Sequence, residues 1–253
     1  MTEKMLQGKT ALVTGAAKRI GRKISIALAQ EGVNVVIHYC NSKKDAQVLC
    51  AQIAELNVNS WVVKADFQKI KECDTLIERS QDIAGSLDIL VNNASIFLPT
   101  KLASLDFETL SRHVQINAWA PFVLSRDFAR SIRKGKIINM LDSRITGGDR
   151  LHTAYILSKQ MLSMLTKMTA LEFAPYITVN GIAPALILPP AGKNERYLKQ
   201  MASSTPLKRH GDPKDISDAV IYLLKSNFLT GQIINVDGGL NLREYGNGPH
   251  LYS

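Results

Sequence analysis

The feature of this sequence that most constrains its fold is a regular alternation between short apolar stretches and longer helical patterns. Stretches typical of buried β-strands occur at residues 10–14, 34–38, 60–64, 87–91, 136–140, 178–182 and 232–236. The helical patterns between them include residues 20–30, 43–56, 107–132 and 153–173. Evenly apolar strands that alternate with helices form a parallel sheet covered on both faces. The sequence therefore predicts an α/β fold with helices on both sides of a parallel sheet.

The chain has the length of one domain. Its 253 residues suit a single α/β domain with a large core, and no repeat, low-complexity segment or linker divides residues 1–253. Residues 186–206 are irregular and rich in Pro, Gly, Lys and Ser. Because this stretch follows the end of a strand, we expect it to be a mobile lid over a site, with a surface loop of no function as the alternative.

Composition and charge exclude several classes of protein. The 45% hydrophobic and 21% charged residues are ordinary for a globular protein. The cysteines Cys40, Cys50 and Cys73 form no C-x-x-C pair, so neither a disulfide framework nor a metal site is predicted. No apolar run approaches the ~18 residues of a membrane span, and residues 1–9 lack the apolar core of a signal peptide. We therefore expect a cytoplasmic protein with reduced thiols and no membrane contact.

The chain is basic, with a net charge of +9. Its basic residues are dispersed along the sequence and no RNA-binding signature occurs among them. We therefore expect anionic small molecules as ligands and no nucleic-acid partner.

Asp142, Tyr155 and Lys159 are the strongest candidate catalytic group. Tyr155 and Lys159 are four residues apart, so on a helix they lie on one face, one turn apart. The ammonium is then expected to stabilise the phenolate and to lower a phenol pKa that is otherwise about 10. The pair predicts a proton donor usable near neutral pH. A solvated tyrosine above a lysine stem is the alternative, and a nucleotide-binding motif elsewhere in the chain argues against it.

That motif is the glycine-containing turn at residues 14–21. Gly15 and Gly21 bracket a turn between the first strand and the first helix, which is the setting that a dinucleotide-binding fingerprint requires. The glycines let the backbone approach a pyrophosphate, and the start of the helix offers unpaired N–H groups. An ordinary tight turn is the alternative.

The end of the second strand indicates which dinucleotide would bind. A protein that binds NAD normally places a carboxylate there for the ribose 2′-hydroxyl, whereas this chain has no acidic residue between the second strand and Asp45. Arg19, Asn41 and Ser42 could instead donate hydrogen bonds to a 2′-phosphate. NADPH is therefore the predicted cofactor, with solvated loop residues as the alternative.

Taken together, these motifs resemble those of the short-chain dehydrogenase/reductase family over nearly the whole chain. The resemblance is carried by residues 14–21, 92–95, Asn117, Tyr155 with Lys159, 180–184 and 231–239. It implies a single doubly wound Rossmann-type domain with a seven-stranded parallel sheet, which is usually a homotetramer. It also implies that Tyr155 is the proton donor, that Lys159 binds the nicotinamide ribose and tunes Tyr155, and that Asn117 holds a water in a proton relay. The cofactor-binding residues implied by the resemblance are Gly15, Lys18, Arg19, Ile20, Gly21, His38, Tyr39, Asn41, Ser42, Asp66, Asn93, Ala94, Lys159 and Pro184.

Two departures from the common family pattern resemble the pteridine reductases and the bacterial dihydromonapterin reductases. Arg19 stands where the family usually has a third glycine, and Asp142 stands where it usually has a serine thirteen residues before the tyrosine. A slip of one residue would place Ser143 there instead. This resemblance implies that Phe97 stacks on a pterin ring and that Arg19 lies near the cofactor phosphates and the substrate. The substrate-binding residues implied in this way are Arg19, Ser95, Phe97, Asp142 and Tyr155.

The chemistry of Asp142 agrees with that subgroup. An ionised carboxylate only accepts hydrogen bonds, so it suits a substrate that carries N–H or NH₂ groups. Burial beside Tyr155 is expected to raise the pKa of Asp142, with Lys159 opposing that rise. The sequence therefore predicts an NADPH-dependent reductase of pterins, with dihydrofolate as a further candidate substrate. A general carbonyl or 3-oxoacyl-thioester reductase is the enzymatic alternative, and a cofactor-binding scaffold without turnover is the non-enzymatic one.

Overall fold

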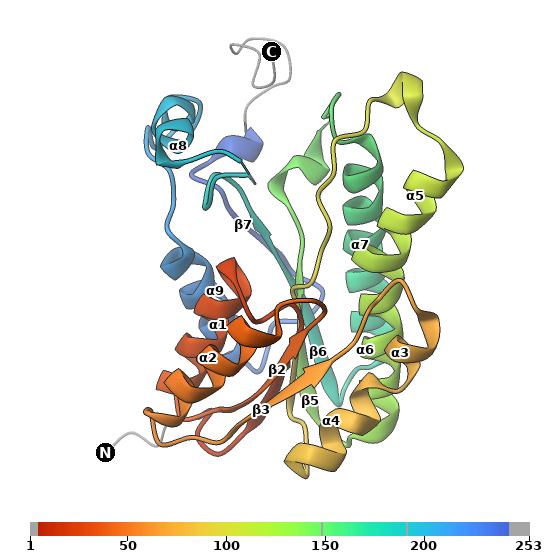
Figure 1. Cartoon of the computed structure of the whole chain (residues 1–253), viewed down its shortest axis with the longest axis vertical. Helices are drawn as coiled ribbons and strands as arrows, with labels where there is room; N and C mark the ends of the chain where they lie inside the picture. Colours follow the sequence, from red (N-terminus) through yellow and green to blue (C-terminus); the bar gives the residue numbers. More distant parts are fainter. Residues whose placement is uncertain (1–4, 148, 191, 243–253) are drawn as a thin grey trace.

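A seven-stranded parallel sheet forms the centre of the molecule (Figure 1). The structure is a computed structural model that describes residues 5–147, 149–190 and 192–242. The strand order is β3-β2-β1-β4-β5-β6-β7 and every pairing is parallel. The strands are β1 (Thr10–Val13), β2 (Asn34–Tyr39), β3 (Ser60–Lys64), β4 (Ile89–Asn92), β5 (Gly135–Met140), β6 (Ile177–Pro184) and β7 (Ile233–Val236). The predicted doubly wound Rossmann-type fold is confirmed.

Helices cover both faces of the sheet (Figure 1). One layer contains α1 (Arg19–Gln30), α2 (Lys43–Ala54) and α9 (Pro213–Lys225), whose apolar side chains pack with β1 and β2 in one core cluster. The other layer contains α3 (Ile70–Asp74), α4 (Leu76–Ala84), α5 (Phe107–Val114), α6 (Ala120–Ser131) and α7 (Thr153–Glu172). Within the described residues no helix has the length and apolarity that a membrane span requires.

The predicted helix at residues 107–132 is interrupted. A π-helical turn, Gln115–Trp119, separates α5 from α6. Pro121 lies in the first turn of α6 and has no N–H, so it cannot donate the usual helical hydrogen bond to the carbonyl of Asn117. The π turn therefore lies where a regular α-helix would lack one hydrogen bond. Such turns are frequent at functional sites.

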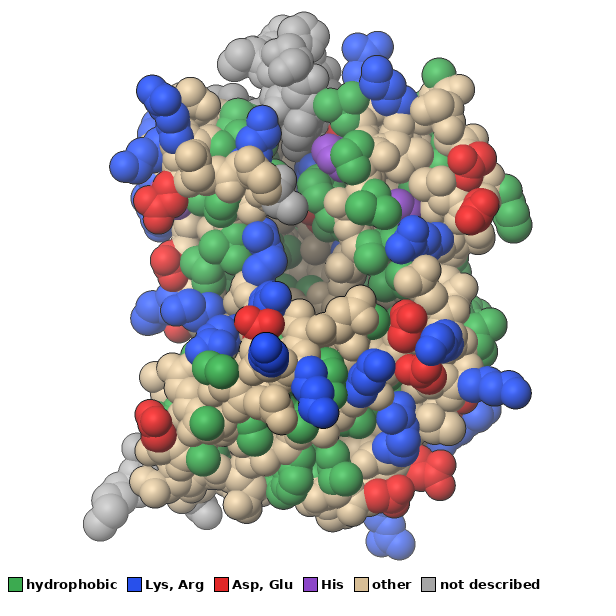
Figure 2. Space-filling view, viewed as in Figure 1, with side chains coloured by type: hydrophobic (Ala, Val, Ile, Leu, Met, Phe, Trp, Pro, Cys, Tyr) green, Lys and Arg blue, Asp and Glu red, His purple; other side chains and the backbone are tan. Residues whose placement is uncertain are grey.

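The stretch expected to be an irregular loop, residues 186–206, contains a helix. α8 (Glu195–Ala202) begins at the N-cap Asn194, whose side chain accepts a hydrogen bond from the Arg196 amide. The prediction of irregular structure throughout this stretch is therefore wrong. Near it, the space-filling view shows a recess between α8 and the side of the molecule formed by α5 and α7 (Figure 2). The recess lies toward the carboxyl ends of the strands, where open α/β sheets bind their ligands.

A chain of buried polar side chains attaches α7 to the sheet. Nδ2 of Asn92 on β4 donates to Oδ1 of Asn139 on β5 over 2.8 Å, and Nδ2 of Asn139 donates to the hydroxyl of Thr166 on α7 over 2.9 Å. The Thr166 hydroxyl then donates to the Leu162 carbonyl over 2.8 Å. Buried hydrogen bonds need particular partners, so they fix the position of α7 more narrowly than apolar contacts alone.

This chain of hydrogen bonds gives a prediction for stability. We expect Thr166→Val to lower the free energy of unfolding by about 1–3 kcal/mol, because the substitution leaves Asn139 without its acceptor. Thr178→Val on β6 is the matched control, since the Thr178 hydroxyl is buried without a partner in the structure. That control should change stability by less than about 0.5 kcal/mol or increase it. Urea unfolding measures both, and equal effects of the two substitutions would contradict the proposed attachment.

Candidate active site

Gly15 and Gly21 let the turn after β1 pack closely against neighbouring backbone. Gly15 has a φ of 61°, in the left-handed region that favours glycine, and a Cβ there would lie 3.0 Å from the Cα of Ala94. At Gly21 a Cβ would lie 2.5 Å from the Gly15 carbonyl oxygen and 2.5 Å from Nδ2 of Asn93. Both positions therefore require glycine.

Thr14 joins this turn to the end of β4. Its hydroxyl accepts hydrogen bonds from the amides of Asn93 and Ala94, each over 2.9 Å. Nδ2 of Asn93 donates in return to the Thr14 carbonyl over 2.8 Å. Asn93 and Ala94, both predicted to contact the cofactor, therefore lie directly beside the glycine turn.

The start of α1 is suited to an anion. Lys18 is the N-cap and makes no side-chain capping bond, and the first turn, which includes Ile20, contains no acidic residue. The positive end of the helix dipole is therefore not neutralised by a carboxylate within that turn. Arg19, at the first position of α1, has a φ of 55°, and its Nη2 donates to the Pro189 carbonyl over 2.8 Å. These residues could hold the diphosphate of a dinucleotide.

His38 supports the glycine turn from beneath. The Gly15 amide donates to Nδ1 of His38 over 3.0 Å, so the proton of the neutral ring is on Nε2, which lies 3.0 Å from the Ala65 carbonyl. The ring is 1% exposed and stacks on Phe67 with centroids 4.6 Å apart. Burial lowers the pKa of His38 to about 4. Its side chain therefore positions the turn through the backbone.

The residues after β2 and β3 form the next part of this edge. Tyr39 ends β2 and is 8% exposed, and Asn41 and Ser42 follow it at the start of α2. Asp66 follows β3, and its carboxylate accepts a hydrogen bond from the Gln68 amide over 3.0 Å. Beyond Asn41 and Ser42, the carboxylate of Asp45 pairs with Nζ of Lys18 at 3.1 Å. The residues after β2 and β3 that are predicted to contact the cofactor therefore lie at the ends of these neighbouring strands, and they are Tyr39, Asn41, Ser42 and Asp66.

Asn117 lies in the π turn and its side chain is fully engaged with protein atoms. Its Oδ1 accepts from the Ile96 amide over 2.8 Å and from the Ser95 hydroxyl over 3.0 Å. Its Nδ2 donates to the Ile96 carbonyl and to the Ser158 hydroxyl, both over 3.0 Å. Asn117 therefore fastens the Ser95–Ile96 segment to α7.

Tyr155 and Lys159 lie one turn apart on α7, as predicted. Nζ of Lys159 is 5.8 Å from the centroid of the Tyr155 ring and donates to the Met140 carbonyl over 2.7 Å. Burial lowers the pKa of Lys159 to about 8, against the opposing effect of the Asp142 carboxylate. Pro184, which ends β6, is the remaining predicted contact at this edge.

The predicted lowering of the Tyr155 pKa is wrong for the described structure. Burial and the neighbouring Asp142 carboxylate hold the pKa of Tyr155 well above its ordinary value. The Tyr155 hydroxyl donates to Oδ2 of Asp142 over 2.9 Å, which stabilises the protonated phenol. Tyr155 therefore stays protonated in this structure, and its hydroxyl acts as a hydrogen-bond donor.

The predicted rise in the pKa of Asp142 is also wrong. Burial does favour the protonated acid, but the charge of Arg144 and its hydrogen bonds outweigh burial and hold the Asp142 pKa below its ordinary value. Nε and Nη2 of Arg144 donate to the two carboxylate oxygens over 2.9 and 2.8 Å, and the Arg144 amide donates to Oδ1 over 2.9 Å. Asp142 is therefore an anion that accepts hydrogen bonds.

Phe97 lies against both Tyr155 and His152. Its ring stacks on His152 with centroids 4.0 Å apart and an interplanar angle of 15°. It meets the Tyr155 ring edge to face, with centroids 4.7 Å apart. Phe97 and Tyr155, both predicted to contact substrate, are therefore brought together with Asp142, whereas Ser95 is turned toward Asn117.

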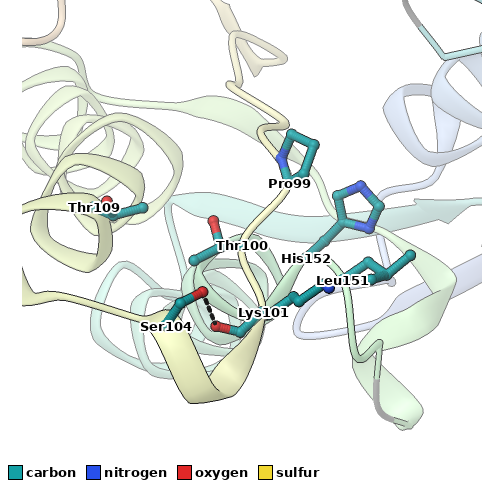
Figure 3. A pocket seen from close by; sticks show the side chains of 7 residues that line it. All are labelled: Pro99, Thr100, Lys101, Ser104, Thr109, Leu151 and His152. Atoms are coloured by element: carbon teal, nitrogen blue, oxygen red, sulfur yellow. Dashed lines mark hydrogen bonds between the residues drawn. The ribbon is translucent and has the colours of Figure 1, made fainter.

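A pocket of about 380 Å³ adjoins this group, since His152 is one of the residues that line it. It lies between the 99–104 segment, α5 and the residues just before α7, and is lined by Pro99, Thr100, Lys101, Ser104, Thr109, Leu151 and His152 (Figure 3). The wall is held by backbone hydrogen bonds from the Thr100 amide to the Leu151 carbonyl and from the Thr153 amide to the Thr100 carbonyl.

Known proteins resemble this chain over nearly its full length. The family described as "Enoyl-(Acyl carrier protein) reductase" matches residues 15–241. Pteridine reductase 1 of Leishmania tarentolae is 34% identical over 281 residues, which cover 92% of this chain and 96% of that protein. The chain belongs to the short-chain dehydrogenase/reductase family. Like other members, it is an oxidoreductase of the type that uses a nicotinamide dinucleotide.

Other relatives in this family differ in the reaction that their names describe. The 3-oxoacyl-[acyl-carrier-protein] reductase FabG of Staphylococcus epidermidis is 33% identical over 240 residues, covering 92% of this chain and 98% of that protein. Among solved structures, FolM alternative dihydrofolate reductase 1 of Brucella canis, complexed with NADP, has a TM-score of 0.91. It is 31% identical, and the match covers 96% of this chain and 97% of that one.

Three residues of this short-chain dehydrogenase/reductase site were missed by the sequence analysis. Arg144, Asp149 and His152 all lie between Asp142 and Tyr155 in the sequence and surround them in space. The available signal was the density of charged and ionisable residues in a short connection next to a candidate catalytic pair. A loop of this kind gives no periodic pattern, so its hydrogen bonds could not be assigned from the sequence.

The buried His38 gives a prediction for pH dependence. Its folded pKa of about 4 is below the unfolded value of about 6.5. As the pH falls through this window only the unfolded chain takes up the proton, so stability is lost. Between about pH 7 and about pH 5 the wild type should lose about 2 kcal/mol more stability than His38→Asn, whose amide oxygen can still accept from Gly15. Urea unfolding at both pH values measures this, and an equal loss in the two proteins would contradict a neutral buried imidazole.

Proposed function

We propose that this protein is an NADPH-dependent reductase of pteridines of the biopterin, dihydropterin or dihydromonapterin type, with dihydrofolate as a further candidate substrate. The observation that carries the proposal is the carboxylate of Asp142, 2.9 Å from the Tyr155 hydroxyl, at the position where the family usually has a serine. The similarity to the Leishmania pteridine reductase and to the Brucella canis FolM structure supports it.

Reduction of a pterin ring C=N bond adds a hydride to carbon and a proton to nitrogen. When bound, NADPH would supply the hydride. Tyr155 would supply the proton, and Asp142 would take part by accepting hydrogen bonds from the hydroxyl of Tyr155 and from N–H groups of the substrate. Phe97 would stack on the flat heterocycle, which favours an offset arrangement of aromatic rings. Lys159 would hold the nicotinamide ribose and oppose the rise in the Tyr155 pKa.

We propose that the cofactor lies along the strand ends. Gly15, Lys18, Arg19, Ile20 and Gly21 would hold its diphosphate, and Asn93, Ala94 and Pro184 would lie along its nicotinamide half. Tyr39, Asn41, Ser42 and Asp66 would contact the adenosine half, with His38 positioning Gly15 from below. The absence of an acidic residue between β2 and Asp45 supports a phosphate on the 2′-hydroxyl. The NADP in the Brucella canis FolM structure agrees with this choice.

A 3-oxoacyl-thioester reductase is the second candidate. The identity of 33% to the Staphylococcus FabG favours it. In that reading Ser143 would be the working residue, although the Tyr155 hydroxyl donates to Asp142 in the structure. A scaffold without turnover is disfavoured, since it has no chemical need for a buried Lys159 beside Tyr155.

Two further features of the protein are proposed from family resemblance. Residues 186–206 would act as a lid whose position depends on the hydrogen bond from Arg19 to the Pro189 carbonyl. A homotetramer would cover the apolar side chains that α7 leaves exposed on one face, which are Leu157, Met161, Met164, Met168 and Leu171.

The cofactor assignment predicts a preference. We expect kcat/KM to be at least tenfold higher with NADPH than with NADH, which corresponds to about 1.4 kcal/mol. Arg19→Ala should narrow this ratio, because the guanidinium can donate to phosphate oxygens. Arg22→Ala is the matched control on the same helix, since its guanidinium donates to Gln52 over 2.7 Å, and it should leave the ratio unchanged. A kcat/KM with NADH that equals or exceeds the value with NADPH would contradict the assignment of NADPH as the cofactor.

The substrate assignment is tested with a panel. Biopterin, dihydrobiopterin, dihydromonapterin, dihydrofolate and an acetoacetyl thioester would each be assayed with NADPH, and turnover of a pterin is expected. Tyr155→Phe should lower turnover by about 10² or more while NADPH binding persists, because only the acid is lost. Asp142→Ser should lower pterin reduction at least tenfold, or about 1.4 kcal/mol, and Ser143→Ala should be nearly neutral. The reverse pattern, with thioester reduction dependent on Ser143, would favour the second candidate.

A further inference from the structure

Arg144 is a partly buried cation whose charge the proposed reaction does not use. Its side chain is 17% exposed and that of Asp142 is 12% exposed. The guanidinium holds both carboxylate oxygens of Asp142 through a two-pronged pair of hydrogen bonds, over 2.9 and 2.8 Å. Such paired contacts fix the geometry of a carboxylate as well as its charge. Arg144 therefore determines where the two oxygens of Asp142 point.

Asp149 holds Arg144 from the opposite side. Nη1 of Arg144 lies 2.8 Å from Oδ2 of Asp149, whose side chain is fully buried. Asp149 also accepts from the Leu151 amide and lies 2.8 Å from Nδ1 of His152. Two carboxylates therefore flank one guanidinium, and the second of them is anchored by two more hydrogen bonds.

The Arg144 guanidinium also lies over the aromatic rings of Phe97 and Tyr155, both of which are predicted to contact the substrate. Its Cζ is 4.9 Å from the centroid of the Phe97 ring and 5.5 Å from that of Tyr155. A cation over an aromatic face is attracted to the ring, so these contacts also restrain Arg144. Within the part of the chain that the structure describes, the charged and titratable groups around Asp142 include Arg144, Asp149 and His152 from the 143–152 connection, and Tyr155 and Lys159 from α7.

We propose that Arg144, held by Asp149, is a positioning residue that keeps Asp142 an oriented anion and so makes the site selective for substrates that offer N–H or NH₂ groups. The proposal rests on the proposed function for the identity of its substrates. A carboxylate buried without a cation takes up a proton, and a carboxylic acid can donate to a ketone or thioester oxygen. A carboxylate anion only accepts, so it repels a carbonyl oxygen and suits the amino and ring N–H groups of a pterin. The guanidinium remains charged across the accessible pH range, so the preference for substrates with N–H or NH₂ groups should not depend on the charge state of Arg144.

The first test does not require a substrate. The protein would be labelled with ¹³C at its aspartate carboxyls, and the Asp142 signal would be assigned by its loss in Asp142→Asn. We expect the titration midpoint of Asp142 to rise by at least one pH unit in Arg144→Gln. It should rise less in Arg144→Lys, which keeps the charge but not the planar fork. Arg150→Gln, which removes an exposed positive charge nearby, should leave the midpoint where it is in the wild type.

The second test measures selectivity. The ratio of kcat/KM for dihydrobiopterin to that for an acetoacetyl thioester should fall at least tenfold in Arg144→Gln and change in the same direction in Asp149→Asn. It should be unaffected in Arg150→Gln, and NADPH binding by fluorescence should persist in every variant. An unchanged Asp142 midpoint or an unchanged ratio in a folded Arg144→Gln protein would overturn the proposal. If the wild type reduces no pterin, the proposed function fails, and the carboxyl titration alone decides whether Arg144 controls Asp142.

Discussion

The joining of the β1 turn to the end of β4 is the constraint on which the rest of the site depends. The Thr14 hydroxyl accepts two backbone hydrogen bonds from Asn93 and Ala94, while Gly15 packs against Ala94 at a distance that excludes a side chain. These contacts set the position of the helix start on one side and of the 95–97 segment on the other. Since His38 holds the same turn from β2, three neighbouring strands share one fixed point. The residues proposed to hold the cofactor and those proposed to contact the substrate therefore share one support.

The chemistry of the site is decided by where charges are buried. In this protein Tyr155 faces a carboxylate rather than a hydroxyl, and the carboxylate is balanced by a guanidinium. The hydrogen bond that the Tyr155 hydroxyl donates to Asp142 disfavours the phenolate, whereas the Arg144 guanidinium favours it. In the proposed reaction, a proton would leave Tyr155 only when a substrate atom offers a better acceptor than the Asp142 carboxylate. This arrangement suits a basic ring nitrogen better than a weakly basic carbonyl oxygen.

Most of the fold was predictable from the sequence, and the site was predictable in part. Apolar strands such as residues 34–38 and 60–64 are short and evenly hydrophobic, so their place in a covered parallel sheet follows from their composition. The Tyr155–Lys159 pair needed only helical spacing. The π turn at Asn117 was not predictable, since helical periodicity continues across it and a single missing N–H at Pro121 decides the outcome. The pKa direction of Asp142 was predicted wrongly because it depends on Arg144, whose contacts arise from a loop without a repeating pattern. That of Tyr155 was predicted wrongly because burial and the Asp142 carboxylate raise its pKa.

The π turn between α5 and α6 changes the direction in which the side chains of this long helical segment point. Relative to a regular α-helix, one extra residue rotates everything on one side of the insertion by about 100° with respect to the other. One continuous helical segment can therefore present Asn117 to Ser95 and Ile96 while Val123, Leu124 and Phe128 still pack in the core cluster under the sheet. The side chains before the π turn and those after it can therefore point in directions that a regular helix would not allow together. Deletion of one residue here would restore regular winding and leave only one of the two faces correctly aimed.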